Sequence, residues 1–209
     1  MQIALPLAPS LRYHLLKAHA LLLMAVGKRA AALPKFAQML RLRPADPYAL
    51  ASRGHVEAQL HLTQEAVASL RQLTSAWPQQ AAGWFNLGYV LQQAGRHDEA
   101  GPAFERAVAL DPRLDRAWYG LAMVRIEQRR FEEAAEALQH NTTLQALGPY
   151  GWYRLAQVWL ALGEPDKARK VIAHLRRFEP RVATQLEREN AAAPQADRAP
   201  TSESDHAAG

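Results

Sequence analysis

The side chains that most often do chemistry in proteins are scattered through this chain. There are eight histidines, and the closest pairs, His14 with His19 and His55 with His61, do not share one face of a helix. The sequence has no HExxH zinc motif, no GxSxG nucleophile turn and no glycine-rich phosphate loop. Cysteine is absent, which excludes disulfides, thiolate catalysis and cysteine-ligated zinc. We therefore expect no metal ion and no cofactor.

Two pairs of adjacent acidic residues have the right type for acid–base chemistry, namely Asp98-Glu99 and Glu132-Glu133. Both pairs stand where a helix is expected to begin, and negative charge stabilises the N-terminus of a helix. A structural role explains their placement, so the sequence predicts a protein that is not an enzyme.

The elements that position these residues repeat along the chain. Alanine recurs at an unbroken spacing of 34 residues, at Ala32, Ala66, Ala100, Ala134 and Ala168. Twelve residues before each alanine stands another small residue: Ala20, Gly54, Gly88, Ala122 and Ala156. Two antiparallel helices approach closely only where both present small side chains, so each pair of columns predicts one helical hairpin. A fixed period of this length is typical of stacked helix pairs, which bury a core only together.

Further columns mark the core and the ends of the helices. Large apolar residues recur sixteen residues before each alanine, and prolines close four of the five units, with Ala146 as the exception. Gly27, Gly95 and Gly163 fall between the two helices of units one, three and five, where a left-handed backbone is expected.

The third unit carries the fullest set of marker residues: Trp84, Leu87, Gly88, Leu91, Gly95, Ala100, Phe104, Ala107 and Pro112. This set resembles the tetratricopeptide repeat (TPR) family. The resemblance extends over five units in register, 170 of the 209 residues. It implies an all-α fold, a right-handed superhelical solenoid of five tandem helix-turn-helix repeats with a C-terminal capping helix.

The repeat divides the chain into four regions. A lead-in covers residues 1–12, five repeats cover 13–182, a capping helix covers 183–190 and a disordered tail covers 191–209. The repeats are expected at 13–46, 47–80, 81–114, 115–148 and 149–182.

The resemblance also implies that the first helix of each unit lines a concave groove. At these places the chain carries aromatic rings, amides and cations, which suit an extended peptide. The expected groove residues are Lys17, Tyr48, His55, Phe85, Asn86, Tyr89, Arg116, Tyr119, Met123, Tyr150, Tyr153, Arg154 and Gln157. Contact through the convex face, an edge or a basic end is the alternative.

One binding mode of the family, capture of a C-terminal carboxylate, requires a set of Lys, Asn and Arg residues from successive units. Asn86 and Arg116 stand at suitable places, but Ala51, His55 and Gly120 stand where the rest of the set belongs. We therefore do not expect this mode.

Several residues depart from the repeat. Arg53 and Glu57 occupy places that are usually apolar, and we expect an ion pair with wetted heads at the edge of a layer, or else a polar network that reaches His19. Arg125 is a similar intrusion. Because Asn141 replaces a small apolar residue and the closing proline is missing, the second helix of unit four is expected to end early, near residues 141–143.

Charge is distributed unevenly along the chain. Residues 1–46 hold seven Lys or Arg against one acid, a net charge of +6, and the fifth unit carries +4, whereas the middle units are nearly neutral. A solvated cationic surface, an acidic protein partner, and nucleic acid or anionic lipid all remain open. Nucleic acid is disfavoured by the mixed-sign middle and by the lack of a binding motif.

The apolar run from Leu15 to Val26 resembles the core of a targeting segment, but its residues fit the first repeat. We expect no transmembrane helix and a cytoplasmic protein, with attachment at a membrane or export as alternatives. The function that the sequence favours is a non-enzymatic adaptor or scaffold that holds a partner peptide or protein segment. The alternatives are an assembly factor or chaperone for a secretion or pilus system, and a regulatory subunit that positions a separate catalytic chain such as a transferase. Neither the partner nor the oligomeric state is fixed by the sequence.

Overall fold

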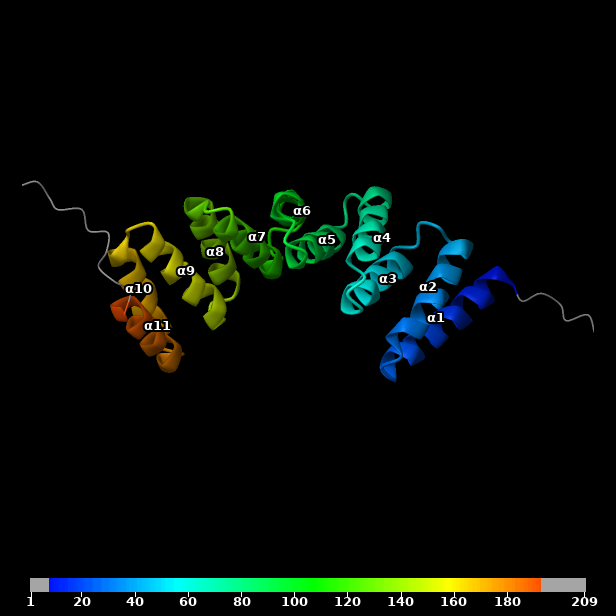
Figure 1. The fold of residues 1–209 in the computed structure, drawn as a ribbon, viewed down its shortest axis with the longest axis horizontal. Helices are drawn as coiled ribbons and strands as arrows, with labels where there is room; N and C mark the ends of the chain where they lie inside the picture. The colour runs from blue at the N-terminus through cyan, green and yellow to red at the C-terminus, as the bar shows by residue number, and fades with distance from the viewer. Residues whose placement is uncertain (1–7, 193–209) are drawn as a thin grey trace, which may run out of the picture.

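Residues 8–192, the part of the chain that the computed structural model describes, form eleven α-helices and no β-strand (Figure 1). The helices are α1 (Pro9–Ala25), α2 (Arg29–Leu42), α3 (Pro47–Gln59), α4 (Thr63–Ala76), α5 (Ala81–Gln93), α6 (His97–Leu110), α7 (Asp115–Glu127), α8 (Phe131–Leu144), α9 (Pro149–Ala161), α10 (Pro165–Leu175) and α11 (Pro180–Ala192). The prediction of an all-α solenoid of helical hairpins is confirmed.

The hairpins stack in sequence order along a curved array (Figure 1). Each helix packs against the next one in the chain, and α5 also contacts both α3 and α7. Helices α3, α5 and α7 are therefore neighbours along one face, which places the predicted groove residues of units two to four on adjacent helices.

Both columns of small residues are buried, and the glycines of the first column lie against large side chains of the second helix. All five alanines of the period are fully buried. A Cβ added at Gly54 would lie 2.8 Å from Cγ of Leu70, and one at Gly88 would lie 3.0 Å from the ring of Phe104. The two helices of these hairpins are thus as close as side chains allow.

Phe104 of α6 also contacts the following unit. A Cβ added at Gly120 of α7 would lie 2.5 Å from Cζ of Phe104, which is fully buried. The ring therefore fills the space between glycines of two successive units and joins their cores.

In each of units three, four and five, a tryptophan is hydrogen-bonded to the end of the preceding unit. The indole nitrogens of Trp84, Trp118 and Trp152 donate to the carbonyl oxygens of Pro78, Pro112 and Ala146, each at 2.9 Å. A carbonyl acceptor is present in alanine as well as in proline, so the missing proline of unit four leaves this bond intact.

All five hairpin turns use a left-handed residue. Gly27, Gly95 and Gly163 have φ angles of 75°, 70° and 70°, as predicted. In units two and four the same place is held by His61 and Arg129, with φ angles of 59° and 58°. Residues with a Cβ are strained in this conformation by about 1–2 kcal/mol.

The polar intrusions are more buried than expected. Arg53 Nε lies 2.7 Å from Glu57 Oε1, so the ion pair is present, but the Glu57 residue is only 3% exposed. Its other oxygen accepts a 2.6 Å hydrogen bond from Ser69 Oγ of α4. The expected wetted head was therefore wrong for Glu57, and the partner that completes the network is Ser69, while His19 is exposed.

Arg125 forms a bridge between units. Its guanidinium is buried and pairs with Glu105 of α6 and, at 3.2 Å, with Glu133 of α8. This residue links the second helix of unit three to both helices of unit four.

The expected early end of unit four was wrong. Helix α8 continues to Leu144 and has 14 residues, as do α2, α4 and α6. Asn141 is accommodated because its side chain donates to the Asp115 carbonyl at 2.9 Å, and because residue 151 is glycine. A Cβ at Gly151 would lie 2.2 Å from Asn141 Oδ1.

The terminal helices extend beyond the predicted boundaries. Helix α1 begins at Pro9, inside the predicted lead-in, and α11 covers Pro180–Ala192, where residues 183–190 were expected. Within the described residues no helix is long and apolar enough to cross a membrane. The predicted disordered tail lies outside the described residues from residue 193 onward.

We predict that His61→Gly and Arg129→Gly each raise the free energy of unfolding by about 0.5–1 kcal/mol, measured by urea denaturation. Relief of left-handed strain is partly offset by the greater freedom of glycine in the unfolded chain. As a control, Gly95→Ala should lower it by about 1 kcal/mol through the backbone alone, since nothing lies within 4 Å of the added Cβ. Unchanged stability in all three variants would contradict the strain.

We predict that Gly120→Ala lowers the free energy of unfolding by about 1–3 kcal/mol, because its Cβ overlaps the buried ring of Phe104. In the double variant with Phe104→Leu the two losses should not add, since the overlap is removed. Gly101→Ala is the matched control, because its Cβ would lie 3.4 Å from Arg125 Nη1 and 3.6 Å from Val124 Cγ1, without the overlap that Gly120→Ala creates. Additive losses would show that Phe104 does not limit this contact.

Candidate functional site

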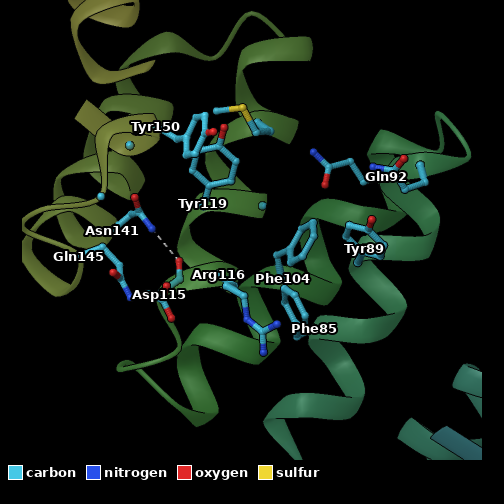
Figure 2. A pocket seen from close by; sticks show the side chains of 15 residues that line it. Phe85, Tyr89, Gln92, Phe104, Asp115, Arg116, Tyr119, Asn141, Gln145 and Tyr150 are labelled. Atoms are coloured by element: carbon cyan, nitrogen blue, oxygen red, sulfur yellow. Dashed lines mark hydrogen bonds between the residues drawn. The ribbon is translucent and has the colours of Figure 1, made fainter. Parts of the chain in front are cut away.

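A cavity of about 610 Å³ lies between units three, four and five, and we call it the central pocket (Figure 2). Its walls come from α5, α7 and the segment from α8 to α9. The lining residues are Phe85, Tyr89, Gln92, Gln93, Phe104, Asp115, Arg116, Tyr119, Gly120, Met123, Asn141, Gln145, Gly148, Tyr150 and Gly151. Six predicted groove residues meet here: Phe85, Tyr89, Arg116, Tyr119, Met123 and Tyr150.

The central pocket combines aromatic walls with one exposed cation. Phe85 rests on Phe104 with ring centroids 6.1 Å apart, and the Arg116 guanidinium lies over the outer face of Phe85 at 5.1 Å. Among the described residues Arg116 has no carboxylate partner. Tyr150 is 77% exposed, so a ligand could cover most of its ring. Such walls can bury an apolar side chain while Arg116 binds a carboxylate.

The wall on the side of unit five depends on the pair of Asn141 and Gly151. Figure 2 shows the Asn141 amide pointing to the Asp115 carbonyl, which joins α8 to the start of α7. Because Gly151 has no side chain, Asn141 packs against the backbone of α9. This contact fixes Asn141 of α8 at the edge of the pocket, and Gln145, the residue that follows α8, lines the pocket beside it.

Two further pockets adjoin the central one and share residues with it. A second pocket, about 360 Å³, lies between α3 and α5 and is lined by His55, Asn86 and Tyr89. A third, about 510 Å³, is lined by Tyr119, Tyr150, Tyr153, Arg154 and residues of α11. Tyr89 lines both the central and the second pocket, and Tyr119 and Tyr150 line both the central and the third. The three pockets therefore follow one another from α3 to α11, and we call this row of pockets the groove.

The C-terminal end of this groove is closed by contacts within the chain. The Tyr153 hydroxyl donates to Glu189 Oε2 of α11 at 2.6 Å and accepts from Gln157 Nε2 at 3.0 Å. The bond to Glu189 raises the pKa of Tyr153, and the same bond lowers the pKa of Glu189. Arg154 donates to Gln157 at 3.0 Å. Tyr153 thus binds α11, while Gln157 is hydrogen-bonded to both Tyr153 and Arg154.

The repeat is also recognised by comparison with known families. Models described as tetratricopeptide repeat match residues 17–79, 53–115, 119–180 and 91–140. The chain belongs to the tetratricopeptide repeat family. TPR proteins are in general interaction modules without catalytic activity, and they bind other proteins or peptides.

Solved structures of TPR proteins superpose on most of the chain. MamA from Desulfovibrio magneticus RS-1 has a TM-score of 0.72 at 22% identity, over 85% of this chain and 96% of that one. YrrB, described as a TPR protein with an unusual peptide-binding site, has a TM-score of 0.70 at 20% identity, over 81% and 88%. PilF of Pseudomonas aeruginosa has 0.69 at 18% identity, over 88% and 89%. At these identities the likeness shows the TPR fold. In a separate comparison, no curated protein matches the sequence.

The remaining predicted groove residues lie apart from the central pocket. His55 and Asn86 face the second pocket, so Asn86 and Arg116 line different pockets. Lys17 and Tyr48 contact each other at the N-terminal end, with the Lys17 amine 3.9 Å from the ring centroid.

Five polar residues that line the central pocket were not predicted from the sequence: Gln92, Gln93, Asp115, Asn141 and Gln145. Gln93 follows Tyr89 by four residues, so helical spacing would have placed it on the same face, and Gln92 lies beside it. Asn141 lies in α8, a second helix, and Gln145 directly follows it, and the assumption that only first helices line a TPR groove excluded both.

Residues of the two acidic pairs form ion pairs and a hydrogen bond within the array. Glu99 pairs with Arg71 of the preceding unit and with Arg96 at 2.6 Å, and Asp98 accepts from Gln128 at 3.1 Å. Glu133 pairs with Arg125 and Arg130. Across residues 8–192 no group of three His, Cys, Asp or Glu side chains could hold a metal ion.

We predict that Tyr153→Phe speeds amide hydrogen exchange in α11 by about threefold to tenfold, the factor expected for one hydrogen bond. The same variant should raise the pKa of the Glu189 carboxyl toward 4.5 in an NMR titration. A carboxylate with a lowered pKa stabilises the fold above its unfolded pKa and loses this effect as the pH falls through the folded value. The difference between variant and parent should therefore shrink as the pH falls from 4.5 through the lowered pKa of Glu189.

Tyr150→Phe is the control, because the Tyr150 hydroxyl has no hydrogen bond among the described residues. Equal exchange in both tyrosine variants would show that the Tyr153 hydroxyl does not hold α11.

Proposed function

We propose that this TPR protein is a non-enzymatic adaptor that holds an extended segment of a partner protein in the groove formed by α3, α5, α7 and α9. The observation that carries the proposal is the chain of three pockets that share Tyr89, Tyr119 and Tyr150. A groove of this length suits a polypeptide segment better than one small molecule.

The central pocket is proposed as the anchor point. An aromatic or large aliphatic side chain of the partner would enter between Tyr89, Tyr119 and Tyr150, where burial of apolar area gives most of the affinity. Arg116 favours a carboxylate beside that side chain, either of an acidic residue or of the chain end. Because its guanidinium already lies over Phe85, little conformational freedom is lost when it binds.

Two neighbouring observations support a peptide ligand. Half-buried amides border the groove at Asn86 and Gln92, and an amide can pair with the backbone of an extended chain. The TPR fold carries a peptide-binding site in YrrB, whose backbone superposes on this one.

Two more specific roles, an assembly factor or chaperone and a regulatory subunit, differ in the kind of partner that is bound. An assembly factor or chaperone would bind an unfolded export or pilus subunit, whereas a regulatory subunit would bind a folded catalytic chain. Both would use the same groove, so the residue preference of the central pocket is the property to measure first.

We predict that immobilised full-length protein enriches, from a random peptide library, sequences with a large apolar residue next to Asp or Glu. Arg116→Glu should reverse the charge preference toward Lys and Arg, because the wall residue changes sign. A selected peptide should lose at least about tenfold in affinity with Tyr89→Ala combined with Tyr150→Ala, by fluorescence anisotropy.

Leu147→Ala is the matched control, since Leu147 is 75% exposed and lies outside the three pockets. Unchanged helicity by circular dichroism should accompany each variant. Peptides that bind the double tyrosine variant as tightly as the parent would place binding outside the groove and refute the proposal.

A further inference from the structure

Helix α1 carries an exposed apolar stripe that no described residue covers. Leu11, Leu15, Leu22 and Val26 are 48%, 52%, 62% and 58% exposed. Their spacing of four, seven and four residues places them on one face of the helix, which continues to the first turn after α1. We call these four residues the α1 stripe.

The α1 stripe faces away from the array. On the opposite face of α1, Tyr13 and Ala20 are buried against the neighbouring helices. Helix α1 lies at one end of the stack (Figure 1), so the four exposed residues form a ridge on a single terminal helix. A ridge of this kind can enter a soft apolar layer, whereas a rigid partner would need a matching groove.

The charge around the stripe is of one sign. Residues 1–45 contain no Asp or Glu, and seven Lys or Arg lie between residues 12 and 43. Within the described part of the chain none of these seven forms an ion pair, whereas the ion pairs of the array begin at Arg53. Arg12 follows the first leucine of the stripe, and Lys28 stands two residues after Val26. Both are exposed.

We propose that the α1 stripe docks the protein on an anionic membrane surface. The apolar side chains of α1 enter the interface between headgroups and acyl chains, and Arg12 and Lys28, the exposed cations beside the stripe, lie at the level of the anionic headgroups. Neither contribution is large enough alone, and peripheral attachment generally requires two such signals.

A second copy of the chain is a poorer occupant of this face. Two copies joined through α1 would bring two acid-free regions together, and these repel. The other end of the array offers α11, whose exposed face carries Arg181, Thr184, Gln185 and Arg188 and does not match an apolar ridge. A membrane with anionic lipid satisfies both the apolar and the charge requirement.

The proposal is independent of the groove, since α1 does not line the three pockets. Docking through α1 would hold one end of the array at the surface and leave the groove open to a partner. The two functions can therefore fail separately in experiments.

The first test is sedimentation of the full-length protein with vesicles. We expect binding to phosphatidylcholine vesicles with about one third phosphatidylserine, little binding to pure phosphatidylcholine, and weakening as salt rises above about 0.15 M. Arg12→Gln combined with Lys28→Gln should weaken binding by about fivefold for each cation removed. Equal binding to both kinds of vesicle would overturn the role of charge.

Leu15→Gln combined with Leu22→Gln tests the stripe, with Leu147→Gln as the control at an exposed leucine elsewhere. The double variant should lose at least about tenfold in affinity, and the control should bind as the parent does. Helicity and melting temperature should be unchanged, because these side chains are exposed. Equal loss in the control, or no loss in the double variant, would refute the proposal.

The second test follows insertion directly. Because the chain contains no cysteine, Leu22→Cys and Leu147→Cys can each be labelled uniquely with an environment-sensitive fluorophore. A blue shift on anionic vesicles is expected at residue 22 and not at residue 147. No shift at residue 22 would show that the stripe does not insert and would overturn the proposal. Dimerisation without vesicles that the double leucine variant abolishes would also overturn it, because the stripe would then bind protein.

Discussion

The close approach of neighbouring helices at side chains no larger than alanine is the constraint on which the rest of the array depends. The five alanines of the period are fully buried, and within the second and third hairpins Gly54 and Gly88 lie against Leu70 and Phe104. Phe104 also lies against Gly120 and so joins units three and four. A helix pair cannot bury its own apolar face, so stability comes from repeating this contact along the stack. The indole hydrogen bonds of the tryptophan column add a polar tie at each step.

Because packing uses only part of each first helix, the remaining face is free to vary. The central pocket is formed where this variation coincides with small residues, at Gly120, Gly148 and Gly151. Gly120 serves both purposes, since it accepts the Phe104 ring and leaves space in front of α7. Asn141 and Gly151 fit each other in the same way, since the missing side chain at residue 151 leaves room for the Asn141 amide, and their contact brings α8 to the edge of the groove. The groove thus depends on the same contacts that stabilise the stack.

The sequence predicted the helical hairpins, their order and the left-handed glycines, because these follow from a 34-residue period and from local backbone chemistry. It predicted six residues of the central pocket by their place in the first helices. It did not predict the length of α8, since the fit of Asn141 is decided by Gly151 of the next unit. The closure of the groove end by Glu189 was also out of reach, because it depends on how α11 docks on α9. Contacts between units are not encoded in any one repeat.

The uneven charge of the chain follows from the way units are joined. In units two to four, cations and carboxylates meet across the boundaries, as in Arg71 with Glu99 and Arg125 with Glu105, and these three units are nearly neutral. The first unit has no acid of its own before Asp46, and that carboxylate caps α3 by accepting from the Ala49 amide. Its cations therefore make contacts with rings and amides, such as Lys17 with Tyr48, which leave the positive charge uncompensated. The unit with the exposed apolar helix is thus also the unit whose charge must be balanced from outside the chain.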